Sequence, residues 1–288
     1  MKSILSLIAL SLLSNFALAA NEIDNLKTSA DLNRFLEKRF PNQAQYFSLD
    51  ESKIVTSEYG KNKFYKLDLD VNGRTDLLID GRYFFAITED IDLKYEIHLV
   101  DRGAFELYKY TLANIVYEDN LPLLKINSYS EGGKEMGNHT ATILMKFGGF
   151  IEYNQKPDHI HIDELNFSTD GCFGTCPIFD LTIAANGIAT YDAKGYNKQE
   201  GKFAGRIDQG SLNRLFDTIN YMGLNSLKST YSVPWTDDRG GTLEIKYDGG
   251  KTKKIVDYGM IGTFGLKNLY DQLAKLRDSQ KWTKSPRK

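Results

Sequence analysis

Apolar residues first recur at helical spacing near the start of the chain. Over residues 29–40, SADLNRFLEKRF, the apolar positions fall three or four apart, which is the repeat of a helix with one buried face. Ser29 can cap the amino end of this helix, and Pro41 stops it. The apolar positions are Leu32, Phe35, Leu36 and Phe40.

From about residue 46 to residue 129 the pattern becomes that of strands. Short runs rich in Tyr, Phe, Ile and Val are separated by Gly, Asn and Asp, which predicts antiparallel strands joined as hairpins. Residues 130–139, SEGGKEMGNH, have the composition of a loop, and TILMKFGGFIEY after them reads as one more strand or hairpin. The clearest runs are KFYKLDLDV, TDLLID, RYFFAIT and YEIHLV.

A second unit begins near residue 156 and mixes the two patterns. HIHIDELNF predicts a strand, and FDLTIAANGIATYDA predicts a hairpin with a type I′ turn at Asn186-Gly187. Two amphipathic helices are predicted, over SLNRLFDTINYM and FGLKNLYDQLAKLRDSQKW, with the hairpin GTLEIKYDGGKTKKIVDYG between them. The order predicts an α+β fold in which antiparallel sheets carry helices on one face. We expect two domains, over residues 20–150 and 156–288.

The first 19 residues have the pattern of a secretory signal peptide. Lys2 precedes an apolar run at residues 4–13 that is too short to span a bilayer, and residues 17–19, ALA, form a small-residue cleavage site. An uncut membrane anchor is the alternative. No Cys lies near the cut and no later segment is apolar enough to span, so we expect a periplasmic or secreted protein without a transmembrane segment.

Composition limits the classes of partner. The chain has 36 Lys and Arg against 38 Asp and Glu, and no basic stripe, so it lacks the charge that binds phosphate backbones and nucleic acid is not an expected partner. Its hydrophobic content of 41% is ample for a packed core, so a disordered chain is not expected.

One loop has the residue spacing of a calcium site. Asp68, Asp70, Asn72 and Asp76 stand at loop positions one, three, five and nine, and Gly73 at position six permits a sharp turn. The flanks read as strands, and position twelve is apolar where an EF-hand has Glu, so the loop is not an EF-hand. The alternative is a hairpin that turns at Asn72-Gly73 with solvated acids on its rim.

A histidine-containing stretch offers a second candidate metal site. If DHIHIDE is extended, His159, His161 and Asp163 share one face of the strand. Two His and a carboxylate are ligands that suit Zn²⁺ or Cu²⁺. The alternative is the polar edge of an amphipathic strand.

The only two cysteines lie in GCFGTCP, residues 171–177. A thioredoxin-type centre has two residues between its cysteines and opens a helix, whereas Cys172 and Cys176 are separated by three residues and followed by a strand-like run. In an oxidising compartment such a pair forms a structural disulfide. A redox-active pair and a metal-binding pair are the alternatives.

Three features of this half of the chain carry a family resemblance. They are GCFGTCPIFDLTI, the following NGIATY hairpin and IVDYG ahead of the last helix. On them, residues 158–282 resemble the bacterial envelope family called domain of unknown function 6438. The resemblance supports export and implies no activity, cofactor or catalytic residue.

No catalytic signature is present in the sequence. HExxH, GxSxG and GxGxxG are all missing, so the sequence favours a non-enzymatic binding or interaction protein. Its partner would be another envelope component, not identified by the sequence, and calcium is the one candidate cofactor. The alternative is a thiol-redox or metal-binding protein centred on Cys172 and Cys176 with His159 and His161.

Overall fold

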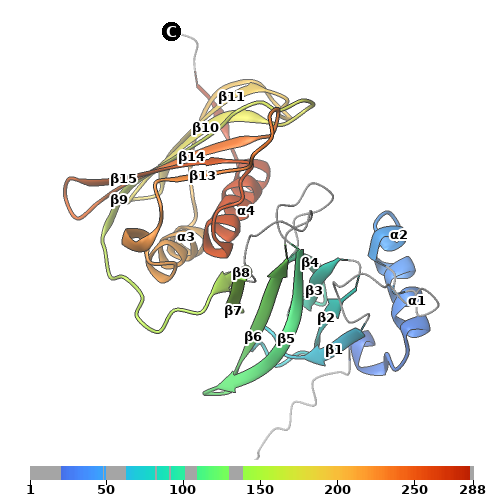
Figure 1. Ribbon diagram of the computed structural model, residues 1–288. Helices are drawn as coiled ribbons and strands as arrows, with labels where there is room; N and C mark the ends of the chain where they lie inside the picture. The colour runs from blue at the N-terminus through green and yellow to red at the C-terminus, as the bar shows by residue number, and fades with distance from the viewer. Residues whose placement is uncertain are drawn as a thin grey trace, which may run out of the picture.

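A computed structural model describes residues 21–47, 49, 63–81, 83–90, 92–100, 109–129 and 139–285. The predicted signal peptide, residues 1–19, lies outside the described residues. The described strands form three sheets, arranged with the helices in successive layers (Figure 1). The predicted α+β class with mainly antiparallel sheets is confirmed.

The first sheet takes its strands in chain order. Helix α1 (Ser29–Arg39) lies against it, with the short helices η1 (Glu22–Asn25) and α2 (Ala44–Phe47). Thr28, and not Ser29, caps α1: its side chain accepts a hydrogen bond from the Asp31 backbone N–H, and Ser29 is already helical. The strands are β1 (Lys63–Leu67), β2 (Asp76–Asp80), β3 (Phe84–Glu89) and β4 (Tyr95–Leu99).

The second sheet is buried on both faces. Leu124 and Ile143 pack against the first sheet, while the neighbouring Leu123 and Leu144 pack against the C-terminal core. Adjacent strand residues point to opposite faces, so burial of both members of each pair requires cover on both sides. The strands, in sheet order, are β5 (Lys109–Glu118), β6 (Leu121–Tyr129), β7 (His139–Lys146) and β8 (Gly149–Glu152).

The third sheet has eight strands and carries its helices on one face (Figure 1). α3 (Gln209–Tyr221) and α4 (Phe264–Ser279) cover the apolar face, and η2 (Leu224–Ser226) follows α3. All neighbours are antiparallel except β13 and β15. In sheet order the strands are β13 (Thr230–Ser232), β15 (Lys251–Tyr258), β14 (Gly240–Tyr247), β9 (Ile162–Thr169), β10 (Ile178–Ala184), β11 (Ile188–Gly195), β12 (Gly201–Arg206) and β16 (Thr283–Lys284).

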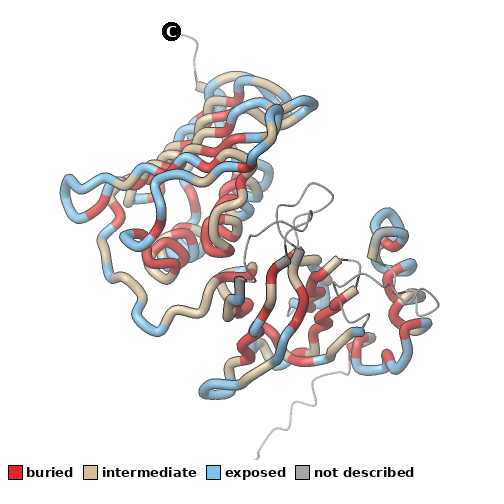
Figure 2. Tube along the Cα trace, viewed as in Figure 1, coloured by how far each residue is buried: buried red, intermediate tan, exposed pale blue. Residues whose placement is uncertain are grey.

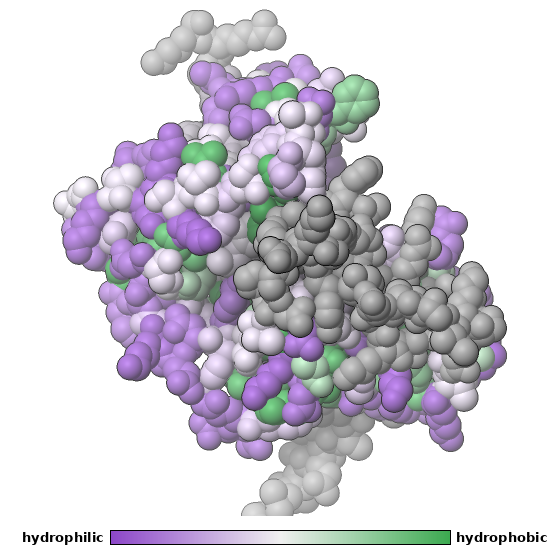
Figure 3. Space-filling model, in the orientation of Figure 1, coloured by the Kyte–Doolittle hydropathy of each residue, from purple (hydrophilic) through white to green (hydrophobic). Residues whose placement is uncertain are grey.

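The opposite face of this sheet is polar. Lys246 pairs with Glu164 at 2.8 Å, and Lys194 pairs with Asp180 at 2.7 Å. Alternate strand residues therefore divide between an apolar core and a hydrated surface (Figure 2). Hydrophilic side chains dominate the visible surface of the C-terminal unit, with apolar groups in isolated spots (Figure 3).

The hairpin at residues 178–195 is confirmed, but its predicted turn type is wrong. Of Asn186 and Gly187, only Gly187 has a positive φ, 80°, whereas a type I′ turn needs two such residues. The loop has three residues, with the left-handed one last, which is the second common hairpin geometry. Successive positive φ values occur instead in three other hairpin turns, at residues 119–120, 147–148 and 248–250.

The two halves of the chain meet where α4 lies on β8. The Glu152 carboxylate accepts hydrogen bonds from the backbone N–H groups of Phe264 and Gly265, at 2.7 and 2.9 Å, and so caps the amino end of α4. Gly149 faces Asn268, whose amide donates to the Lys146 carbonyl at 2.9 Å. Because the hydrophobic core continues through this contact, the domain boundary near residue 156 stays a prediction.

Candidate functional site

The structure brings three of the four candidate calcium ligands together. Asp68, Asp70 and Asp76 each place a carboxylate oxygen so that these oxygens lie within 4.8 Å of one another. Asn72 belongs to the same loop, where its Oδ1 accepts a hydrogen bond from the Arg74 N–H at 2.8 Å. Three converging carboxylates are a donor set that fits a hard cation such as Ca²⁺.

Burial raises the pKa of two carboxyl groups in this loop. The Asp76 carboxylate accepts the Leu69 and Glu89 N–H groups at 2.8 and 3.0 Å, yet burial raises its pKa to about 7 because the charged form loses its water. Burial, with the nearby charge of Asp68, also raises the pKa of Asp70. A bound cation would relieve both effects.

A buried ion pair fixes the loop to the first sheet. The Arg74 guanidinium pairs with the Glu89 carboxylate, and the Arg74 Nε donates to Oε2 at 2.7 Å. Both side chains are almost completely buried, at 8% and 4% exposed. Such a pair holds the loop in one position, since breaking it would leave a charge buried without a partner.

The histidine stretch does not form the predicted strand face. β9 begins only at Ile162, so His159 and His161 lie in the segment before it, and both are exposed. His161 approaches Asp163 at 3.7 Å. Among the described residues, the three do not form a cluster of convergent metal ligands.

Cys172 and Cys176 are bonded to each other, in the loop that joins β9 to β10. The loop is tied to β9 and to the segment before β14. Thr169 Oγ1 donates to the Pro177 carbonyl at 2.7 Å, and the Phe173 N–H donates to the Asp237 carbonyl at 3.0 Å. A strand follows the pair, so the helix amino terminus that lowers a catalytic thiol pKa is not there.

Phe173 projects from the tip of this disulfide loop. It is 92% exposed, the largest value among the exposed large hydrophobic residues of the described chain. Its backbone is held by the disulfide and by Asp237, so the ring is presented from a fixed position. An aromatic side chain presented in this way is a feature of interaction surfaces.

A cavity of about 140 Å³ lies beside the disulfide loop, between the third sheet and α4. Its aromatic wall includes Phe167 stacked on Tyr270, with ring centroids 5.1 Å apart. Arg239, from the segment before β14, lines it as well. The other lining residues are Thr169, Asp170, Cys176, Pro177, Phe179, Met260, Lys267, Asp271, Ala274 and Arg277.

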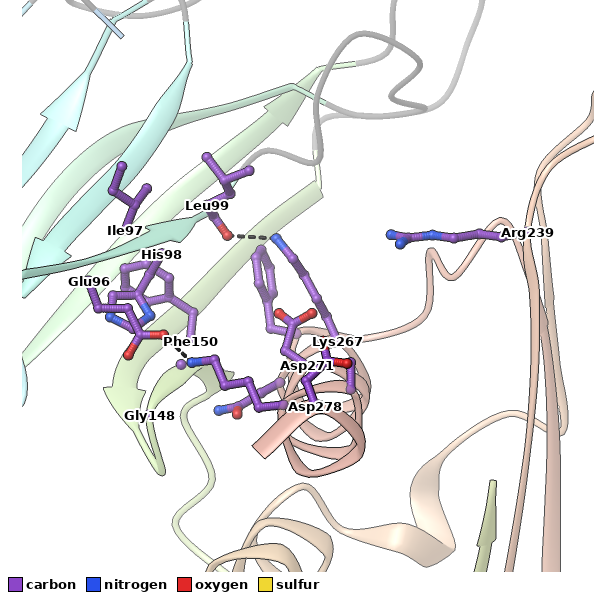
Figure 4. Close-up of a pocket in the computed structure, with 15 residues that line it drawn as sticks. Glu96, Ile97, His98, Leu99, Gly148, Phe150, Arg239, Lys267, Asp271 and Asp278 are labelled. Carbon is purple, nitrogen blue, oxygen red and sulfur yellow. Dashed lines mark hydrogen bonds and ion pairs between the residues drawn. The ribbon is translucent and has the colours of Figure 1, made fainter. Parts of the chain in front are cut away.

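A larger cleft of about 420 Å³ adjoins this cavity and separates α4 from β4 (Figure 4). Lys267 crosses it to donate to the Leu99 carbonyl at 2.6 Å, and Lys275 pairs with Glu96. His98 faces the cleft, and its Nε2 lies 2.9 Å from Thr88 Oγ1. Burial lowers the pKa of His98 to about 4.

No sequence pattern indicated the cavity. Its wall comes from strand positions that alternation assigns only to a core, such as Phe167 and Phe179, and from Arg239, sixty or more residues further along. The one signal that could have indicated it is the CFGTCP loop, because Cys176 and Pro177 form part of the wall.

None of the helices in the described part of the chain is long and apolar enough to cross a membrane. No curated protein matches the chain, and no solved structure does. Residues 163–277, which carry the disulfide loop and the cavity, match the model of the family described as Domain of unknown function (DUF6438).

Proposed function

We propose that this chain is an exported, non-enzymatic binding protein, and that the disulfide end of its third sheet is the binding surface. The observation that carries the proposal is the 92% exposure of Phe173 at the tip of a loop held by a disulfide and by the Asp237 carbonyl. An aromatic ring that is exposed in its own chain gains most from burial in a partner.

The rigidity of the loop favours binding by this surface. A partner that buries Phe173 does not have to order the backbone around it, because the Cys172–Cys176 bond already does so. Ordering of loops and side chains is one of the main free-energy losses of association. A disulfide in the loop is therefore consistent with a role in presenting the ring, as well as with a role in stability.

Export is the second part of the proposal. The signal peptide pattern at residues 1–19 and the disulfide at Cys172 and Cys176 both fit an oxidising compartment outside the cytoplasm. The partner would then be another component of the envelope or of the extracellular space. N-terminal sequencing of the exported protein should begin within a residue or two of Ala20.

The proposed role of calcium is structural. We propose that the Asp68, Asp70 and Asp76 carboxylates hold one Ca²⁺, with Asn72 in the same loop. The ion would stabilise the turn between β1 and β2, which lies in the N-terminal half and away from Phe173 in the chain. The convergence of three carboxylates supports this role.

The alternative, a thiol-redox or metal centre at Cys172 and Cys176, has less support. The pair lies between two strands, with no helix start to stabilise a thiolate, and His159 and His161 are exposed and precede β9. Catalysis of insulin reduction by the purified protein, lost in a Cys172→Ser and Cys176→Ser variant, would favour this alternative.

The binding proposal can be tested by comparing complexes extracted from producing cells. Phe173→Ser removes the proposed anchor, and Tyr117→Ser is the matched control, since Tyr117 is an exposed aromatic residue of the β5–β6 hairpin at 65% exposed. We expect native mass spectrometry to find a complex of one defined mass with the wild type and the control but not with Phe173→Ser. No complex, or equal complex with all three proteins, would contradict the proposal.

A further inference from the structure

We propose that the 140 Å³ cavity beside the disulfide loop binds an aromatic ring that carries a carboxylate group. The inference rests on the binding function proposed above and gives it a ligand chemistry. Two features of the cavity carry it. One is an aromatic interior of ring size, and the other is a lining cation, Arg239, whose guanidinium has no partner among the described residues.

The interior fits a single ring. A cavity of roughly 150 Å³ in a protein core is large enough to take a benzene molecule. Here Phe167 is stacked on Tyr270 with an angle of 15° between the rings, and Phe179 packs edge-on to Phe167 at 5.9 Å. Aromatic walls of this kind favour a flat, apolar guest that can stack or pack edge to face.

One of the cations that line the cavity is open to an anion. Three cations and two acids line the cavity. Two of the cations have partners: Lys267 donates to the Leu99 carbonyl, and Arg277 pairs with Asp278 at 3.1 Å. The Arg239 guanidinium has no hydrogen-bond or ion-pair partner in the part of the chain that the structure describes.

Arg239 is placed to reach a ligand in the cavity. It lines both the cavity and the adjoining cleft, and Figure 4 shows its side chain extending from the segment before β14 toward Lys267 on α4. A guanidinium offers two parallel N–H donors to a carboxylate. A ring in the cavity with its carboxylate at the mouth would therefore meet an apolar wall and a free cation at once.

The site belongs to the family domain. The residues that line the cavity lie between Phe167 and Arg277, inside the segment 163–277 that matches the family model. Cys176 and Pro177 form part of its wall, so the disulfide also holds one side of the cavity in place.

The test compares two probes, 3-phenylpropionate and the uncharged 3-phenylpropanol. Each is titrated into the mature full-length protein, and binding is measured by calorimetry. We expect the acid to bind more tightly than the alcohol. Arg239→Gln should weaken the acid about tenfold and leave the alcohol unchanged, since one charge-assisted hydrogen bond corresponds to about that factor. Arg34→Gln, on α1, is the control and should change neither.

A second variant tests the position of the ring. Ala274→Trp places an indole at the cavity wall and should abolish binding of both probes, while the thermal unfolding curve shows whether the variant is folded. Should it not fold, heteronuclear NMR of the wild type gives the same information, because shifts on adding the acid should centre on Thr169, Arg239 and Ala274. No binding by the wild type, or equal binding of acid and alcohol by wild type and Arg239→Gln, would overturn the proposal.

The same chemistry is found in free aromatic acids and in peptides that end in an aromatic residue. A short peptide ending in Phe, with a free or an amidated carboxyl terminus, separates the two sources. A peptide ligand should bind better than 3-phenylpropionate, lose affinity on amidation and lose more with Phe173→Ser, whereas a free acid should not respond to Phe173→Ser.

Failure of this inference differs from failure of the proposed function. If the probes do not bind while the complex still depends on Phe173, the ligand chemistry is wrong and the binding surface stands. If the probes bind and no Phe173-dependent complex exists, the cavity stands and the partner surface is wrong.

Discussion

Asp76 joins the candidate calcium loop to the buried part of the first sheet. Its carboxylate is fully buried and its pKa is raised to about 7, so near neutral pH the folded chain gains from any group that stabilises the charged form. A cation held with Asp68 and Asp70 is such a group. The burial of Asp76 is therefore a reason to expect an ion in the loop. The spacing of the acids alone does not provide that reason.

Calcium should therefore stabilise the protein. At a tenfold excess over Kd we expect an increase of about 1.4 kcal/mol in the free energy of unfolding. Asp70→Ala should remove the increase, and Asp217→Ala, an exposed acid on α3, should not. Thermal melts of the three proteins in calcium and in chelator measure this. Identical melting of the wild type in both solutions would show that the loop is only a turn.

Because of His98, we expect the folded protein to lose stability in acid. Its folded pKa, about 4, lies below the ordinary value of 6.5 because burial disfavours the charged ring. The unfolded chain then binds more protons than the folded chain between these values. The contribution of His98 is complete above pH 6.5 and is lost as the pH falls toward 4.

The size of this effect is limited by the part of the ring that meets solvent, so we expect about 1–3 kcal/mol. His98→Gln should flatten the dependence of the unfolding free energy on pH over that window, measured by urea unfolding at several pH values. A wild-type profile already flat from pH 6.5 to 4, or an unchanged slope in the variant, would contradict it.

Single residues were predicted from the sequence where local spacing decides their role. Asp68, Asp70 and Asp76 converge because they lie on one tight loop, and Cys172 and Cys176 bond because few residues separate them. Residues whose role depends on the fold were not found. Nothing local distinguishes the half-buried His98 from an exposed histidine. Nor does anything local distinguish Arg239, whose guanidinium has no partner among the described residues, from other surface arginines.

At the scale of elements, the disulfide loop is a local clamp. Closing so short a loop lowers the entropy of the unfolded chain by an amount worth about 2 kcal/mol. Cys172→Ser with Cys176→Ser should reduce the unfolding free energy by about this much and leave the sheet intact. Because Phe173 lies in the loop, we also expect weaker partner binding. Urea unfolding and circular dichroism test the first point, and collapse of the fold would contradict it.

α4 depends on a residue from the other half of the chain. Glu152 on β8 accepts the Phe264 and Gly265 N–H groups, which would otherwise be buried at the contact between β8 and α4 without a partner. Glu152→Ala should lower the unfolding free energy by about 1–2 kcal/mol. Glu118→Ala is the control, since Glu118 is an exposed acid at the end of β5. Equal stability of the two variants in urea would contradict the cap.

Long, periodic elements were predicted well, and short ones were not. α3 and α4 follow the expected apolar stripes, with Leu212 and Leu215 buried on one and Leu269 and Leu273 on the other. β13 and β16 have only three and two residues, so they have no repeat to recognise. The strand expected from His159 begins at Ile162, since alternation alone does not show where pairing with a neighbour starts.

At the scale of the molecule, the order of the layers could not be predicted. Both faces of the second sheet are covered, by the first sheet and by the C-terminal helices. Alternation indicates which residues are buried but not which element buries them. The cavity could not be predicted for the same reason, because its wall is formed by β9, β10, the segment before β14 and α4. The resemblance to the family is confirmed over residues 163–277, while the envelope location stays a proposal.

The disulfide end of the third sheet is the proposed contact with a partner. A photo-crosslinking phenylalanine analogue at position 173, with the same analogue at position 117 as control, tests this in producing cells. We predict one adduct of defined mass from position 173, reduced when Cys172 and Cys176 are both changed to Ser, and none from position 117. No adduct from position 173, or the same adducts from both positions, would contradict it.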